Sequence, residues 1–214
     1  MSPRRRPSPI ADTPKRDRDL VRLYWPAELR PAFDALFDID DAMADVVARS
    51  TEPALAAIKL AWWRERLEEL DHGTVPAEPR LQAAASELLP RDISGAELAG
   101  LEAGWATLLQ ERPDRDVALS RGLMMFGLAA RLLGQNPPEF LEIGGALYAA
   151  GSLARLGFAP DGLVVITQSP RVPRRFRPLT ALAALSRRDL GRREPEATPG
   201  RAWTLLRHRL TGRI

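Results

Sequence analysis

Apolar residues recur at helical spacing along nearly the whole chain, and proline or glycine stands at most breaks between the periodic segments. A helical period buries one side of each segment, so such a chain must build its core by packing helices together. The pattern predicts helices over residues 15–25, 28–49, 51–71, 79–89, 94–110, 114–133, 137–156, 179–190 and 199–210. We therefore expect an all-α fold, a single-domain helical bundle over residues 15–214.

Two segments lie outside this pattern. Glycine and proline crowd residues 157–173, where 163–167 is the only strand-like run, and one short run without a partner cannot form a sheet. This segment is expected to be a connector. Residues 1–14 carry basic charge with no apolar run behind it, which predicts a disordered basic tail rather than a secretory signal.

Length and cysteine content narrow the class of protein. The chain has 214 residues, enough to bury a stable core without a structural metal site or disulfide bonds. It has no cysteine, which excludes thiol catalysis and cysteine-ligated zinc and makes a reducing, cytoplasmic compartment the expected one. No uninterrupted run of about 18 apolar residues occurs, so no membrane-spanning helix is predicted.

Charge is divided unevenly along the chain. The net charge is +3, yet residues 171–214 hold twelve arginines, no lysine and three acids, a net of +9 that leaves −6 for the rest. A basic segment on an acidic body predicts an anionic partner. We expect a membrane surface, at the inner face of the membrane, or a protein partner rather than nucleic acid. The alternative is a general preference for arginine, since the chain has 29 arginines and two lysines.

An acidic stripe marks the helix predicted over residues 28–49. At about 100° per residue, its four aspartates fall within roughly 60° of one another, opposite the apolar face. They are Asp34, Asp38, Asp41 and Asp45. Asp41 and Asp45 have the i, i+4 spacing that can bridge Mg²⁺. The alternative is a solvated face, although four like charges repel by a few tenths of a kcal/mol per pair. Asp40 alone lies on the apolar side.

A family resemblance follows from the next segment. Residues 36–70 combine the acidic helix, the Thr51-Glu-Pro turn and the run Trp62-Trp63-Arg64. This segment resembles the N-terminal part of squalene/phytoene synthase-like proteins, especially the divergent branch that includes the mitochondrial complex I assembly factor. The later segments 122–134, 144–155 and 178–189 resemble further helices of that family.

The resemblance implies an isoprenoid-synthase fold with a central cavity. Active members of the family join two prenyl diphosphates head to head, and two aspartate-rich motifs on facing helices hold Mg²⁺. The resemblance implies that Asp41 and Asp45 are metal ligands. It also implies a substrate-binding role for Trp63, Arg64, Tyr148 and Arg155.

The second motif departs from the family pattern. Arg155 is kept, but Leu156 stands where an aspartate is expected. Leucine cannot bind Mg²⁺. The resemblance therefore implies a catalytically degenerate protein without a cofactor, which binds a prenyl diphosphate or lipid ligand or helps to assemble a membrane-associated complex.

Two alternatives stay open. The first is an active, Mg²⁺-dependent prenyl diphosphate synthase whose second metal wall uses Asp161 or Glu142. The second is a helical adaptor that binds through its basic C-terminal segment, residues 171–214. In that case the segment should be removable while the body stays folded.

Overall fold

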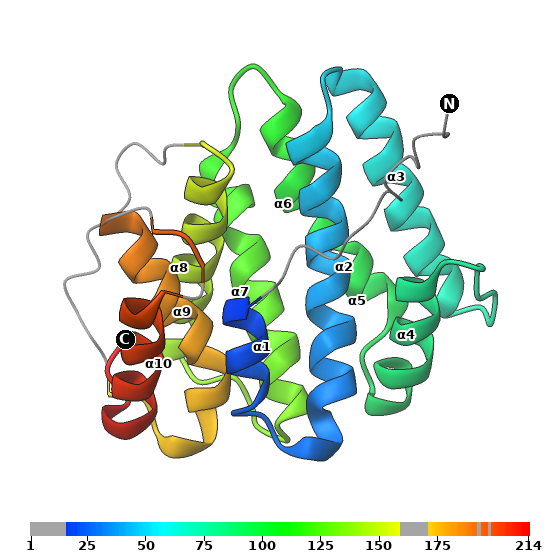
Figure 1. Ribbon diagram of the computed structural model, residues 1–214. Coiled ribbons are helices and arrows are strands. Elements are labelled where there is room, and N and C mark those ends of the chain that lie inside the picture. Colours follow the sequence, from blue (N-terminus) through cyan, green and yellow to red (C-terminus); the bar gives the residue numbers. More distant parts are fainter. Residues whose placement is uncertain (1–15, 159–170, 192–193, 197) are drawn as a thin grey trace, which may run out of the picture.

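The chain folds into one all-α domain, as a computed structural model shows for residues 16–158, 171–191, 194–196 and 198–214 (Figure 1). Its helices are α1 (Arg16–Arg22), α2 (Arg30–Arg49), α3 (Pro53–Leu70), α4 (Pro79–Glu87), α5 (Gly95–Ala99), α6 (Leu101–Ala106), α7 (Arg115–Leu132), α8 (Phe140–Arg155), α9 (Arg177–Gly191) and α10 (Pro199–Thr211). Within these residues there is no strand, only a single antiparallel bridge between Arg171 and Arg213. The all-α prediction is confirmed. The predicted tail, residues 1–14, and the strand-like run 163–167 lie outside the described residues.

Most predicted helix boundaries agree with the structure because proline and glycine set them locally. Pro53 stands in the first turn of α3, where its missing N–H costs nothing, and Pro199 does the same in α10. Gly73 ends the α3 region with a φ of 81°, a value that favours glycine. The predicted cap of α3 was Thr51, but the residue that precedes the first helical turn is Glu52.

The single helix predicted over residues 94–110 is divided in the structure. Ser94 starts α5 with a capping box, in which Ser94 and Glu97 each accept a hydrogen bond from the other's backbone N–H. Gly100 separates α5 from α6, and residues 107–109 form a 3-10 turn. Apolar spacing continues through these breaks, so periodicity alone could not find them.

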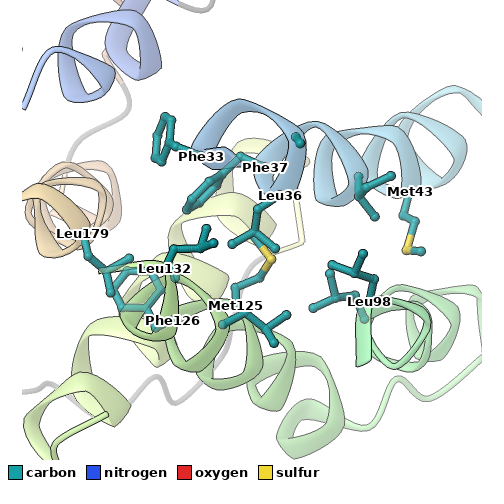
Figure 2. Close-up of a cluster of buried hydrophobic side chains, with 14 of the residues drawn as sticks. Phe33, Leu36, Phe37, Met43, Leu98, Met125, Phe126, Leu132 and Leu179 are labelled. Carbon is teal, nitrogen blue, oxygen red and sulfur yellow. The ribbon is translucent and has the colours of Figure 1, made fainter. Parts of the chain in front are cut away.

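One cluster of the core lies between the apolar side of α2 and buried side chains of α5, α7 and α9. Figure 2 shows α2 side chains on one side of this cluster and side chains of the other helices facing them. The labelled residues are Phe33, Leu36, Phe37 and Met43 of α2, Leu98 of α5, Met125, Phe126 and Leu132 of α7, and Leu179 of α9. The side of α2 opposite the acidic stripe is therefore buried, as its amphipathic pattern predicts.

Two glycines let α7 and α8 approach each other closely. A Cβ atom built on Gly122 would lie 2.0 Å from the carbonyl oxygen of Gly145, and one on Gly145 would lie 2.5 Å from the carbonyl oxygen of Gly122. Real Cβ atoms do not approach backbone oxygen so closely. The two backbones therefore touch directly at this crossing.

The basic C-terminal segment belongs to the core of the domain. α9 packs between α8 and α10 and buries Leu179, Ala181 and Leu185. Removing residues 171–214 would expose that core, so the structure gives no support to a body that stays folded without the segment, and the adaptor alternative stays a prediction. Over the described helices, none is long and apolar enough to cross a lipid bilayer.

His208 anchors α10 from inside the protein. It is buried, its Nε2 lies 2.9 Å from the Oγ1 of Thr180, and its Nδ1 lies 2.8 Å from the carbonyl oxygen of Arg213. A carbonyl oxygen only accepts hydrogen bonds, so Nδ1 carries the proton. Burial lowers the pKa of His208, and the charge of Arg177 lowers that pKa further.

We expect the free energy of unfolding to fall as the pH drops through about 6.5, the ordinary pKa of histidine. Because the folded-state pKa of His208 is lowered, the unfolded chain binds more protons than the folded one in this range. Urea denaturation over a pH series measures the effect. His208→Gln should flatten the pH dependence. An unchanged slope in the His208 variant would contradict the prediction.

Candidate functional site

α1 lies beside the acidic stripe of α2, and its arginines bind the stripe (Figure 1). Arg18 donates to Asp38 and, at 2.6 Å, to Asp41. One turn later on α1, Arg22 Nε donates to Asp34 Oδ2 at 2.5 Å. Three carboxylates on one helix face are thus bound by two arginines of a neighbouring helix.

The Arg18 ion pairs are partly shielded from solvent. Burial by itself lowers the pKa of Arg18, but the negative charges of Asp41 and Asp38 together raise that pKa above its ordinary value. The guanidinium is therefore charged at every pH at which the protein is folded. It acts as a fixed positive charge on this part of the stripe.

A small cavity of about 170 Å³ lies where α1, α2, α8 and α9 meet. Phe37, Leu182 and Leu185 give it an apolar part. Its polar lining consists of Asp17, Arg18, Asp41, Tyr148, Ser152, Arg155, Ser186 and Glu196. Drug-sized ligands usually occupy roughly 300–1,000 Å³, so the cavity as it stands fits only a small group.

The structure brings together three of the six predicted site residues. Asp41, Tyr148 and Arg155 line the cavity. Trp63 is instead buried in the core beneath α3, and Arg64 is exposed on the same helix. Asp45 accepts a hydrogen bond from Arg49 one turn along α2, at 3.1 Å. The binding roles assigned by resemblance stay predictions for all six.

Arg155 lies at the centre of an ion-pair network that joins four helices. Its Nη2 donates to Asp189 at 2.7 Å and its Nη1 donates to Glu196 at 2.5 Å. Asp189 also accepts from Arg201 of α10, which in turn donates to Asp17 of α1. The network ties α1, α8, α9 and α10 together around one side of the cavity.

An active synthase would need a second group of metal-binding acids at the cavity. Within the described residues, no such group is present. Leu156 is half-buried at the end of α8 and packs against the core. Glu142 is exposed in the first turn of α8, away from the cavity lining. Asp161 lies outside the described residues.

A buried acid beside the cavity completes the site. Asp40 accepts from Nη1 of Arg121 at 2.6 Å, from Nε1 of Trp105 at 2.9 Å and from the hydroxyl of Tyr148 at 2.7 Å. The Arg121 guanidinium lies 3.9 Å above the centre of the Trp105 ring. Both members of the Asp40–Arg121 pair are almost fully buried. Sequence reasoning missed this pair, although a lone aspartate on an apolar helix face is a signal for a buried cation.

The Asp40–Arg121 pair also holds two cavity residues in place. Nη2 of Arg121 donates to Oγ of Ser152 at 2.5 Å, and Tyr148 is fixed by its hydrogen bond to Asp40. Burial raises the pKa of Tyr148 well above its ordinary value, and the charge of Asp40 raises it further. The phenol is therefore a hydrogen-bond donor at neutral pH, not an anion.

The carboxylates of Asp41 and Asp45 do not fit a magnesium ion as they are arranged. Mg²⁺ requires near-octahedral oxygen coordination, and each of these carboxylates accepts a hydrogen bond from an arginine instead. In the part of the chain that is described, no three carboxylate or imidazole side chains are grouped to hold a metal. An ion at Asp41 would first have to displace Arg18.

Comparison of the chain with protein-family models, with curated proteins and with solved structures found no match. The resemblance to squalene/phytoene synthase-like proteins therefore stays an expectation drawn from the residues themselves. The function has to be inferred from the chemistry of the cavity and of the ion pairs around it.

Proposed function

We propose that this protein is a catalytically inactive helical binding protein, with a bundle of the isoprenoid-synthase type. The observation that carries the proposal is the position of Arg18, whose guanidinium binds Asp38 and Asp41 at the cavity. A positive charge belonging to the chain thus stands where the first motif would hold Mg²⁺. Leu156 in place of the expected aspartate supports the same conclusion.

The ligand we propose is the polar end of a prenyl phosphate or similar lipid. Arg155 would supply positive charge by exchanging Glu196 for the phosphate, and the hydroxyl groups of Tyr148 and Ser152 lie beside it on the cavity lining. The apolar part at Leu182 and Leu185 suits the first carbons of a chain. A cavity of about 170 Å³ does not enclose a whole prenyl chain, so the tail would extend out of it.

An active prenyl diphosphate synthase is the second candidate. The observation that favours it is that Asp41, Tyr148 and Arg155 line one cavity, as the resemblance implies for the family's two motifs. For this function Arg18 would have to release Asp41. Measured turnover separates the two candidates.

The test uses the full chain with farnesyl diphosphate, in the presence and absence of Mg²⁺. We expect the ligand to raise Tm by roughly 5 to 10 °C at about 100 times its Kd, equally with and without Mg²⁺. No pyrophosphate should be released. Calorimetric titration should show weaker binding for Arg155→Gln, while a variant of an exposed residue before α7, Arg112→Gln, should bind normally.

Two results would contradict the proposal in different ways. Release of pyrophosphate that depends on Mg²⁺ and is abolished by Asp41→Asn would show an active synthase. Neither a rise in Tm nor measurable heat of binding would show that the cavity does not hold a prenyl phosphate.

A further inference from the structure

α10 carries an apolar stripe on the side that faces away from the protein. Trp203, Leu206 and Leu210 are 65%, 42% and 70% exposed. Their spacing of three and four residues places them on one helix face, within about 60° of one another. The opposite face is the one that α10 buries against α9 and α1, through Arg201, Leu205 and His208.

The position of α10 leaves this stripe uncovered by the rest of the described chain. Figure 1 shows α10 at the outer edge of the bundle, next to α9. Large apolar side chains are common singly on protein surfaces, but a continuous row on one helix face marks an interaction surface. One face of α10 packs against the protein, and the opposite face carries the exposed apolar stripe.

Exposed arginines flank the stripe. On the helix, Arg207 lies about 40° to one side of Trp203, and Arg209 lies about 60° beyond Leu206 on the other side. Both guanidinium side chains are exposed, and so is Arg213 just after the helix. An apolar stripe between cationic flanks is the pattern of a helix that lies in a membrane interface.

A basic groove adjoins the stripe between α9 and α10. Its volume is about 680 Å³, and its lining includes Arg187, Arg188, Arg207, Arg213 and Trp203. Trp203 and Arg207 therefore belong to both the groove and the stripe region. The groove is wide enough for a phosphate-bearing head group and offers guanidinium donors suited to phosphate.

Of the three acids of the C-terminal segment, Glu194 neutralises one arginine of the groove, Arg188, and the other two are bound by an arginine outside the groove. Asp189 and Glu196 are bound by Arg155, and Glu194 is bound by Arg188. These pairs lie within the domain or beside the cavity network. The exposed arginines Arg207, Arg209 and Arg213 lie apart from these pairs and give the surface around α10 its positive charge.

We propose that α10 and the adjoining arginine groove dock the protein on an anionic phospholipid bilayer. Trp203, Leu206 and Leu210 enter the boundary between head groups and acyl chains, and the arginines bind lipid phosphates. A second copy of the chain fits this surface poorly because it would set arginine against arginine. Nucleic acid fits poorly because apolar side chains occupy the middle of the surface. This inference does not depend on the proposed ligand of the cavity.

Sedimentation with vesicles tests the docking surface. The full chain should bind phosphatidylcholine vesicles that contain phosphatidylglycerol and should bind pure phosphatidylcholine vesicles at least about tenfold less. Binding should weaken as salt is raised, because ionic screening reduces the arginine contribution. Equal binding to both kinds of vesicle would overturn the proposal.

Matched variants locate the surface on α10. Trp203→Ala with Leu210→Ala should lower vesicle binding by about tenfold or more, since two large apolar side chains are truncated. Leu55→Ala with Ile58→Ala removes a similarly exposed pair from α3, away from the arginine groove, and should have no effect on binding to anionic vesicles. Arg207→Glu should lower binding by about fivefold or more, whereas Arg112→Glu, at an exposed position before α7, should not. Equal losses on α3 and α10 would overturn the proposal.

Fluorescence gives a second measurement that does not rely on sedimentation. Trp62 and Trp203 are the exposed tryptophans, so a Trp62→Phe background leaves Trp203 as the one accessible to lipid. Brominated phospholipid in the anionic vesicles should quench this emission. Absence of quenching would overturn the proposal, as would Trp203-dependent dimers or duplex RNA binding that replaces vesicle binding.

Discussion

Replacing Arg121 with methionine is expected to lower the free energy of unfolding by about 3 to 5 kcal/mol. The change removes the guanidinium that neutralises Asp40 and leaves a carboxylate charge inside the core. Urea denaturation at neutral pH measures the loss. The cavity should also change, because Arg121 holds Ser152 on its lining.

Two comparisons separate charge burial from lost packing. Adding Asp40→Asn to the Arg121→Met variant removes the stranded charge, while the amide oxygen can still accept from Trp105 and Tyr148. The double variant should regain about 1 to 2 kcal/mol over Arg121→Met alone. Arg131→Met breaks an exposed pair and should cost about 1 kcal/mol at most. Strictly additive effects in the double variant would show that the pair is not coupled.

Alanine in place of Gly122 is expected to destabilise the domain by about 3 kcal/mol or more. The new Cβ would lie 2.0 Å from the carbonyl oxygen of Gly145, and only a shift of backbone could relieve that contact. α7 and α8 would have to separate at their crossing. Thermal and urea denaturation measure the loss.

The same substitution elsewhere in α7 provides the control. A Cβ on Gly127 would meet no atom within 4 Å, so Gly127→Ala should stabilise the helix by about 0.5 to 1 kcal/mol. The same change from glycine to alanine should thus lower the free energy of unfolding at position 122 and raise it at position 127 of one helix. If both variants were equally stable, the close approach of α7 and α8 would be wrong.

The helices were predictable because their signals are local. Pro53 and Pro199 fix first turns, Gly73 supplies a left-handed end, and the apolar spacing of α2 identifies its buried side. The division at Gly100 was missed because apolar spacing runs through it. Whether a helix boundary could be predicted thus depended on a few neighbouring residues in the sequence.

The pairing at the candidate site could not be predicted in this way. Arg18 meets Asp41 across 23 residues, and Arg121 meets Asp40 across 81. No local pattern says which of many arginines reaches a given aspartate. Sequence reasoning therefore identified the acidic stripe but not the cation that binds it, and the chemistry of the stripe depends on that cation.

The ion pair between Asp17 and Arg201 joins residues that are 184 positions apart. During synthesis, the carboxylate on α1 is made among the first residues of the domain and its partner on α10 among the last. α1 can therefore complete its docking only after α10 has been made, since this contact has a very large loop to close. The partners that cover α2, among them α4, α6 and α7, all precede α10 in the chain. The main core can therefore form first, and the contact between α1 and α10 closes the side of the domain beside the cavity last.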